Sequence, residues 1–328
     1  MGETLTIATR GSKLALWQSE HVKSLLEKSH RDIEVNLNII STKGDQILDQ
    51  ALNKIGDKGL FTAELEASLR DGSSDIAVHS LKDLESSLAS DLVIHAVLER
   101  EDERDVLLVR SDNQEAMPLR RLASDAVLGT GSMRRTALAK NIRPDLQVED
   151  LRGNVDTRVN KLVEGQYDAI VLAAAGLLRL GYLNDSNLSP SEELTSQGIS
   201  VSPLEIEDWL PAACQGTIGI EGRQGDERVA SLLAPLNHPD TRICSEAERA
   251  FLSKLEGGCQ IPAGVHARLT ADSNVDIRAA VFSADGALSY IGNRSVPRDN
   301  ALQASAELAQ ELLDQGADKI LNELKPKD

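Results

Sequence analysis

The stretch LTIATRGSKLALWQ, residues 5–18, sets the expectation for the fold. Its first five residues predict a short strand, and Arg10-Gly-Ser12 predicts a tight turn. A helix is expected to open at Leu14 and to run to about Ser29. A strand that passes through a turn into a helix is the building unit of α/β sheets. The opening of the chain therefore predicts an α/β fold.

The same alternation continues to residue 98. Strands are predicted at 34–40, 75–79 and 92–98. A helix is expected to carry Leu60, Phe61, Leu65 and Leu69 on one face.

The pattern restarts after a charged stretch at 99–105. Strands are predicted at 107–109, 126–128, 147–151 and 169–173, with helices at 132–141 and 155–165. Ser132 suits the N-cap of the first of these helices. Residues 185–202 are rich in Ser, Asn and Glu and are predicted to be a surface loop. The repetition predicts two α/β units of similar build.

The character changes again from about Pro239. A helix at 241–255, an alternating strand at 274–283 and an amphipathic helix at 301–313, ended by Gly316, are predicted. These elements indicate a third, smaller α+β domain.

The composition narrows the classes of function. The formal net charge of −17 argues against a nucleic acid or an anionic membrane as the main partner. The N-terminus has no secretory signal pattern, and the longest apolar run, at 169–178, is too short to span a bilayer. Three cysteines form neither an even disulfide framework nor a C-x-x-C pair. We therefore expect a cytoplasmic protein.

Basic and small polar residues recur where strands are predicted to end. Such ends, and the helix N-termini that follow, are where α/β sheets bind anions. Any single arginine there is more often a solvated surface residue, but the recurrence favours a polyanionic ligand. The turn GTGSMR lacks the third glycine of a dinucleotide fingerprint. The residues concerned are Arg10, Ser12, Lys43, Asp45, Lys58, Lys82, Asp83, Thr130, Ser132, Arg134, Arg135, Arg152, Gly153 and Arg158.

Two further residues leave alternatives open. Asp83 next to Lys82 is either a surface ion pair or, among cations, a carboxylate that stabilises positive charge or moves a proton. His79 is either a packed core residue or a reactive one. No Cys or His spacing indicates a metal site.

Cys259 lies in LEGGCQIPAG, residues 255–264, between two glycines and a proline. It is a structural thiol, a nucleophile or a covalent attachment point. Gly257 and Gly258 let the backbone approach a bulky group closely. The residues alone do not choose among these.

Nine motifs in fixed order resemble the porphobilinogen deaminase (hydroxymethylbilane synthase) family from end to end. They are TIATRGSKLALWQ, TKGD, GDKGLFTAELE, DIAVHSLKD, GTGSMRR, LRGNVDTR, DAIVLAAAGLLRLG, PAACQGTIGIE and LEGGCQIPAG. The resemblance implies two domains like those of type II periplasmic binding proteins, with the active site in the cleft between them. Domain 1 would comprise residues 1–100 and about 216–236, domain 2 residues 105–212, and the α+β domain 3 residues 239–328.

The resemblance also implies the chemistry. The enzyme would join four porphobilinogen molecules head to tail, release ammonia each time, and hydrolyse off hydroxymethylbilane. Cys259 would hold a dipyrromethane cofactor by a thioether, and Asp83 would be the catalytic carboxylate. No metal is implied, and a monomer is expected.

Roles for the remaining residues follow from the same resemblance. Cofactor carboxylates would be bound by Lys82, Asp83, Thr130, Ser132, Arg134, Arg135, Arg152, Gly153 and Arg158. Substrate would be bound by Arg10, Ser12, Arg152, Arg158 and Arg179, with Asp45 a further candidate. Lys58 and Phe61 would belong to a loop that covers the site. The rival hypothesis, a non-catalytic binding protein for small anions, does not account for Cys259 and predicts no ammonia release.

Overall fold

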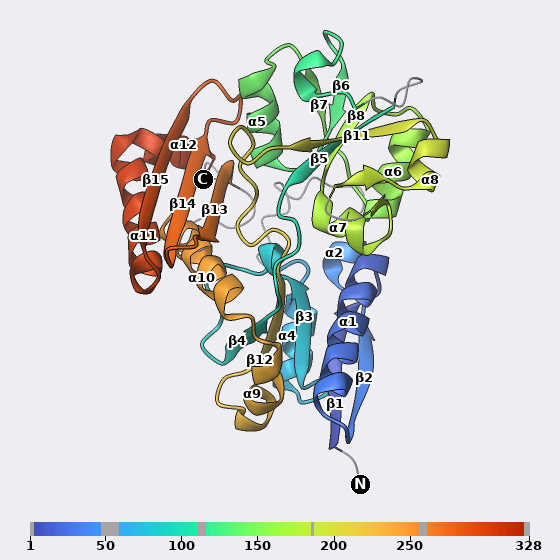
Figure 1. Ribbon diagram of the computed structural model, residues 1–328, viewed down its shortest axis with the longest axis vertical. Coiled ribbons are helices and arrows are strands. Elements are labelled where there is room, and N and C mark those ends of the chain that lie inside the picture. Colours follow the sequence, from blue (N-terminus) through green and yellow to red (C-terminus); the bar gives the residue numbers. More distant parts are fainter. Residues whose placement is uncertain (1–2, 47–58, 111–115, 185–186, 256–260, 325–328) are drawn as a thin grey trace. The chain divides into compact units, whose positions relative to one another are not determined.

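The computed structural model describes residues 3–46, 59–110, 116–184, 187–255 and 261–324 (Figure 1). The chain divides into two compact units. Unit 1 contains Met1–Glu101 and Gly216–Arg242, and unit 2 contains Asp102–Gln215 and Ile243–Asp328. The expected domains 2 and 3 therefore cluster together in unit 2, and the division into three domains stays a prediction.

Unit 1 is built on a five-stranded sheet of order β2-β1-β3-β12-β4. The strands are β1 (Glu3–Arg10), β2 (Ile33–Ile40), β3 (Ile76–Ser80), β4 (Leu92–Val97) and β12 (Ile218–Arg223). β1 is parallel to both β2 and β3, whereas β12 is antiparallel to β3 and β4. The carboxyl ends of β1, β2 and β3 consequently meet at one edge of the sheet.

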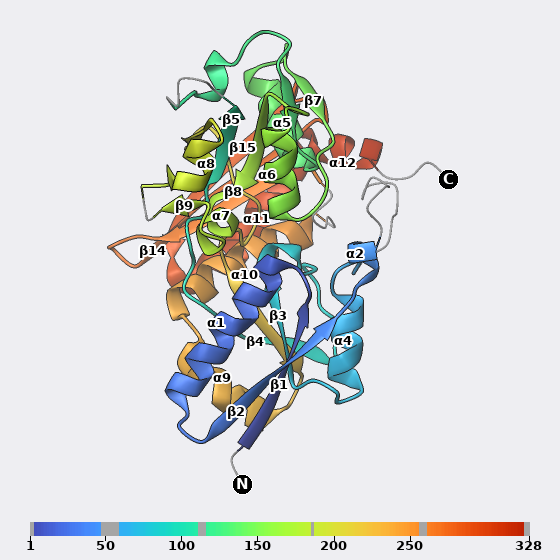
Figure 2. The same cartoon turned by 90° about the vertical axis from the view of Figure 1, so that its right-hand side faces the viewer.

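Helices cover both faces of this sheet. The helical elements of unit 1 are α1 (Lys13–Ser29), α2 (Lys43–Gln46), α4 (Ala63–Arg70), η1 (Leu81–Asp83), α9 (Glu227–Leu233) and η3 (Ala234–Leu236). α10 (Pro239–Lys254) begins in unit 1 and continues into unit 2. Leu5 and Ile7 of β1 share a core with α1 and α9, whereas Ala8 packs with α4. Figure 2 shows α1 and α4 on different sides of β1. This is the alternation that a buried strand imposes.

Unit 2 repeats the strand order of unit 1. Its sheet runs β11-β5-β8-β6-β7, in which β6, β7 and β8 correspond to β1, β2 and β3. The strands are β5 (Asp105–Arg110), β6 (Val127–Gly129), β7 (Gln147–Glu149), β8 (Ala169–Ala173) and β11 (Ile199–Leu204). β5 is antiparallel to its neighbours, as β12 is in unit 1. Each of these two strands follows directly after the chain passes from the other unit.

The sheet of unit 2 is also covered on both faces. Its helices are η2 (Leu119–Arg121), α5 (Met133–Ile142), α6 (Val155–Val163), α7 (Ala174–Arg179) and α8 (Glu192–Ser196), and β9 (Leu183–Asn184) pairs with β10 (Ser189–Pro190). Leu107 and Val109 of β5 share a core with α5, whereas Val106 and Leu108 pack with α6 and α7. Two α/β units of similar build are therefore confirmed.

The prediction of a surface loop at 185–202 is wrong for the second half of that segment. Residues 192–196 form α8, and Ile199 begins β11, which pairs antiparallel with β5 along its whole length. Ile199 and Val201 enter the core. Ser200 is also buried and donates a hydrogen bond to the carbonyl of Val109 at 3.4 Å, so its hydroxyl is compatible with a buried strand. The serines in this segment therefore favoured the prediction of a loop, although the segment forms a strand that pairing with β5 stabilises.

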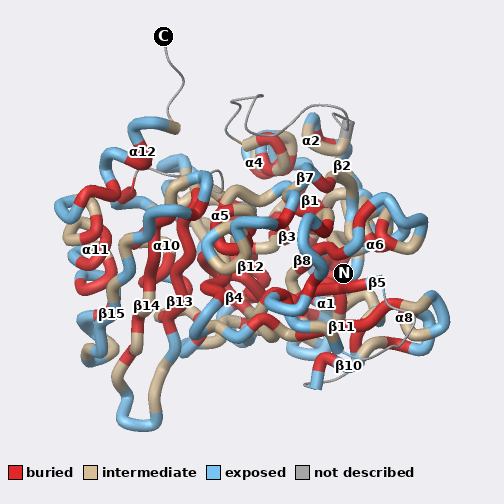
Figure 3. The backbone as a smooth tube through the Cα atoms, turned by 90° about the horizontal axis from the view of Figure 1, so that it is seen from above, coloured by how far each residue is buried: buried red, intermediate tan, exposed pale blue. Residues whose placement is uncertain are grey.

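The C-terminal part of unit 2 is a three-stranded antiparallel sheet with helices. It consists of β13 (Ala263–Leu269), β14 (Asn274–Phe282), β15 (Ser289–Pro297), η4 (Arg298–Asn300), α11 (Ala301–Leu312), η5 (Leu313–Ala317) and α12 (Asp318–Leu324). Figure 3 shows β13 more buried than β15. Phe282 packs in the same core as Leu138 of α5, which joins this part to the second sheet. Gly316 adopts φ +123°, in agreement with its expected role after α11.

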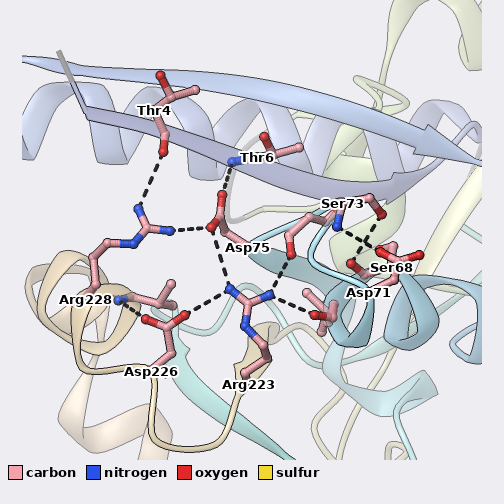
Figure 4. A network of polar contacts seen from close by, with 12 residues as sticks. Thr4, Thr6, Ser68, Asp71, Ser73, Asp75, Arg223, Asp226 and Arg228 are labelled. Carbon is pink, nitrogen blue, oxygen red and sulfur yellow. Dashed lines mark hydrogen bonds and ion pairs between the residues drawn. The ribbon is translucent and has the colours of Figure 1, made fainter. Parts of the chain in front are cut away.

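A charged network ties the amino end of β3 to β1 and α9 (Figure 4). Asp75 accepts a hydrogen bond from the backbone of Thr6 at 2.8 Å and pairs with Arg228. Arg223 donates to the carbonyl oxygens of Leu69 and Ser74 at 2.8 and 2.9 Å. The network lies before β3 and so braces the end of the sheet opposite the carboxyl ends of the strands.

Substitution of Gly216 tests the passage of the chain back into unit 1. Gly216 has φ +87°, and a Cβ there would clash with the backbone oxygen of Glu101. Gly225 has φ +79° with nothing within 4 Å of its Cβ position. Gly225→Ala is therefore expected to cost about 1–2 kcal/mol from backbone strain alone. Gly216→Ala is expected to cost roughly 1–3 kcal/mol more. Urea unfolding measures both, and equal losses would contradict the close approach.

Candidate functional site

Predicted site residues gather at the carboxyl edge of the sheet in unit 1. Arg10 is the last residue of β1, Asp45 lies in α2 after β2, and Asp83 lies in η1 after β3. Because these strands are parallel, the three positions share one edge of the sheet. Ser12 accepts a hydrogen bond from the backbone of Ala15 at 3.3 Å and so caps α1.

The Arg10 guanidinium is held by Asp45 and Phe61. Its Nε donates to Oδ2 of Asp45 at 3.2 Å, and a terminal nitrogen pairs with the other carboxylate oxygen. The ring of Phe61 lies 4.3 Å from the guanidinium carbon, a cation–π distance. Burial would raise the pKa of Asp45, but hydrogen bonds from Arg10 and Thr42 lower it below its usual range. The Asp45 carboxylate thus pairs with the Arg10 guanidinium in the way that a carboxylate of a ligand would.

Asp83 is exposed where β3 ends, and Lys82 beside it is half-buried. Their placement at a sheet edge with Arg10 agrees with the prediction of a polar site there. His79, in contrast, is buried in β3, and its Nε2 lies 3.0 Å from the carboxylate of Glu221 in β12. His79 is therefore the packed core residue of the two alternatives.

The turns after β6 and β7 lie against each other in unit 2. Ser132 caps α5 by accepting from the backbone of Arg135 at 3.4 Å, as predicted for an N-cap. A Cβ on Gly131 would stand 3.0 Å from both a side-chain oxygen of Asp150 and the carbonyl of Leu151. The structure thus brings the turn at 129–132 beside the turn at 150–153.

The arginines after β7 contact their own turn. Nε of Arg152 lies 2.9 Å from Asp150, and Nε of Arg158 donates to the carbonyl of Gly153 at 2.7 Å. Gly153 has φ +109°, which favours glycine. Arg179 is the last residue of α7, which follows β8 directly.

Arg134 and Arg135 are buried on either side of one carboxylate, that of Asp105. Arg134 donates to it at 2.9 Å, and Arg135 donates through two nitrogens at 3.2 and 2.7 Å. Trp209 Nε1 and Gln215 Nε2 each donate at 2.8 Å. We call these five residues the Asp105 cluster.

Electrostatics fix the charge states in this cluster. Full burial would raise the pKa of Asp105, but the two guanidiniums lower it far below its usual range. Burial also lowers the pKa of Arg134, and the neighbouring Asp105 opposes this shift. The two guanidiniums therefore favour the ionised form of Asp105.

Sequence reasoning missed Asp105, Trp209 and Gln215. Asp105 closes the charged stretch 99–105 and so had the appearance of a surface charge. The only local sign that Asp105 is buried is the apolar strand that follows it directly. Cys259 and Lys58 lie outside the described residues, and their roles stay predictions.

Other kinds of site find no support in the described part of the chain. There, no group of three or more His, Cys, Asp or Glu residues is placed to hold a metal ion. No helix among the described residues is long and apolar enough to cross a membrane.

Two family models match the chain. The first, described as "Porphobilinogen deaminase, dipyromethane cofactor binding domain", matches residues 5–231. The second, described as "Porphobilinogen deaminase, C-terminal domain", matches residues 242–314. The chain belongs to the porphobilinogen deaminase family. It is accordingly an enzyme of tetrapyrrole synthesis with a dipyrromethane cofactor.

Curated relatives match over nearly their whole length. The porphobilinogen deaminase of Syntrophomonas wolfei is 47% identical over 98% of this chain and 99% of its own. That of Sulfurimonas denitrificans is 42% identical over 97% and 96%. Among solved structures, the periplasmic VFT2 domain of Bordetella pertussis BvgS is 17% identical, with a TM-score of 0.40 over 70% of this chain and 85% of that domain.

The residues of unit 2 fit a group that carries carboxylates. The Asp105 cluster holds two guanidiniums against one carboxylate. Beside them, α5 presents its N-terminus with Thr130 and Ser132 at the carboxyl edge of the sheet. Cations and helix N-termini are the partners that carboxylates prefer in proteins.

The pH dependence of unfolding tests the buried carboxylate. Because the folded-state pKa of Asp105 is depressed, its stabilisation is complete above the unfolded pKa of about 3.9 and is lost as pH falls below it. Between pH 5 and 3, the unfolding free energy of the wild type should therefore fall more steeply than that of Asp105→Asn. The slopes should differ by up to about 1.4 kcal/mol per pH unit. Trp209→Phe keeps the carboxylate and should keep the wild-type slope; equal slopes for wild type and Asp105→Asn would contradict the assignment.

Proposed function

We propose that this chain joins four porphobilinogen molecules head to tail onto a dipyrromethane attached to Cys259, and releases hydroxymethylbilane by hydrolysis. The observation that carries the proposal is the gathering of Arg10, Lys82 and Asp83 at one sheet edge, in a chain that belongs to this family. The cofactor supplies the pyrrole carbon to which the first substrate is joined.

Asp83 is the proposed catalytic carboxylate. It is exposed at the end of β3, where it can reach a substrate that binds at the sheet edge. Each addition expels the aminomethyl nitrogen of porphobilinogen as ammonia and leaves a positive charge on the pyrrole that must be stabilised. A carboxylate beside the pyrrole N–H lowers the energy of that cation and accepts or returns a proton.

Cations at the two sheet edges are proposed to bind carboxylates. In unit 1, Arg10 and Ser12 would bind the substrate, whose carboxylate would replace Asp45 on the guanidinium. In unit 2, the α5 N-terminus and the arginines of both turns would bind cofactor and substrate, namely Thr130, Ser132, Arg134, Arg135, Arg152, Arg158 and Arg179, together with Gly153. The many cations suit a product whose negative charge grows with each unit added.

Phe61 is proposed to cover this site together with Lys58. The contact of the Phe61 ring with the Arg10 guanidinium supports such a role, because it places an apolar cover over a ligand-binding cation. A monomeric state and a location in the cytoplasm complete the proposal, and both stay predictions.

Replacement of Asp83 tests the proposed chemistry. Asp83→Asn keeps the size of the side chain and removes the charge and the proton acceptor, so kcat for ammonia release should fall by about 10²–10⁴-fold. Asp83→Glu should retain more activity than Asp83→Asn, because the carboxylate remains.

Glu85→Gln is the matched control, since it neutralises a carboxylate two residues along the same segment. It should change kcat less than about twofold, as expected for a group outside the chemistry. Full activity of Asp83→Asn would overturn the assignment. Absence of ammonia release from the wild type loaded with its cofactor would overturn the enzyme itself and favour an anion-binding protein.

A further inference from the structure

The carboxylate of Asp105 has no freedom to turn. One of its oxygens accepts from Arg135 and Gln215, and the other accepts from Arg134, Arg135 and Trp209. The side chain is fully buried at the start of β5. Its position therefore dictates where both guanidiniums lie.

The Asp105 cluster carries a surplus positive charge. Apart from Asp105, the hydrogen-bond partners of the two guanidiniums among the described residues are the carbonyl oxygens of Leu210 at 2.7 Å and Val171 at 2.9 Å. Two guanidiniums against one carboxylate leave a net charge of about +1 in a buried place. Because a buried charge is unfavourable without a counter-charge, the cluster favours an anion within reach of its remaining N–H groups.

The segment 209–215, sequence WLPAACQ, links the cluster to the C-terminal sheet. Its two ends donate to Asp105 through Trp209 and Gln215. Between them, the carbonyl of Pro211 accepts from the backbone of Val265 in β13 at 3.2 Å. The segment is thus fixed both to the arginines and to β13.

Glu248 of α10 completes this link. It is fully buried, and its two carboxylate oxygens accept from the backbone of Cys214 at 2.5 Å and of Ala267 at 2.7 Å. α10 and β13 are the elements that precede and follow Cys259 in the chain. The segment 209–215 and Glu248 therefore connect the Asp105 cluster, through a chain of hydrogen bonds, to the elements on both sides of the proposed attachment site.

We propose that Asp105 is a positioning residue that sets Arg134 and Arg135 in register with the chain flanking Cys259. The inference rests on the proposed function, in which a group attached at Cys259 places its carboxylates on these arginines. A short ligand with one end fixed covalently meets its charged partners only if they stand at a set distance from the anchor. The Asp105 cluster and the segment 209–215 supply that constraint.

A double-mutant cycle tests this role. Asp105→Asn is made in the wild type and in Cys259→Ser, which cannot carry the thioether. For all four proteins the Tm is measured, and for those with Cys259 the loaded fraction is read from the intact mass of the unfolded chain. A positioning role predicts that Asp105→Asn lowers the loaded fraction. It also predicts a smaller difference in Tm between the proteins with Cys259 and with Cys259→Ser. In the Asp105→Asn background this difference should fall below about half its wild-type value, because the two sites are coupled.

A purely structural role would give another result. Asp105→Asn would then lower the Tm equally in both backgrounds and leave the loaded fraction at its wild-type value, which would overturn the inference. Glu221→Gln is the control for loss of a buried carboxylate, since Glu221 is fully buried in unit 1. Its effect on the Tm should be the same with and without Cys259.

A second variant keeps the test decisive where Asp105→Asn does not fold. Trp209→Phe keeps an aromatic ring and removes only the N–H donated to Asp105. It should therefore also reduce the loaded fraction and the Tm gained from Cys259, but by less than Asp105→Asn does. Additive Tm shifts with full loading in this variant would overturn the inference. An unloaded wild type would instead overturn the proposed function, which separates the two failures.

Discussion

The burial of one carboxylate between two guanidiniums is the interaction on which unit 2 depends. Without Asp105, Arg134 and Arg135 would place two like charges in the interior. Removing one partner of such a group typically costs about 3–5 kcal/mol, because an uncompensated charge remains buried. The same carboxylate joins β5, α5 and the segment 209–215. The ion cluster therefore also holds these parts of unit 2 together.

The chain passes between the units at equivalent places in the two sheets, which have the same strand order. In each sheet four strands run in one direction and a single strand runs against them. The antiparallel strand is the first one laid down after each passage: β5 in unit 2 and β12 in unit 1. Asp105 opens β5, so the ion cluster forms where the chain enters its second sheet.

The sequence predicted those parts of the fold that local periodicity controls. Strands such as 169–173, the cap Ser132 and the role of Gly316 follow from patterns a few residues long. β11 escaped prediction because it depends on pairing with β5, a neighbour distant in the sequence.

The candidate site divides in the same way. Sheet topology follows from the alternation of strands and helices, and so the collection of Arg10, Asp45 and Asp83 at one edge was predictable. Where each guanidinium points was not, since the carboxylates that hold Arg134 and Arg10 come from other elements. Asp105 escaped notice because a single sequence gives no sign that a charged residue will be enclosed.

The central claim, that Cys259 anchors the dipyrromethane cofactor, is tested most directly by fragment mass mapping of the freshly purified, active enzyme. The chain has three cysteines, so Cys214 and Cys244 are internal controls. The account predicts that the fragment with Cys259 carries the added mass of two linked pyrroles, while the fragments with Cys214 and Cys244 have their unmodified masses. An unmodified Cys259 fragment from active enzyme, or the added mass on another cysteine, would contradict it.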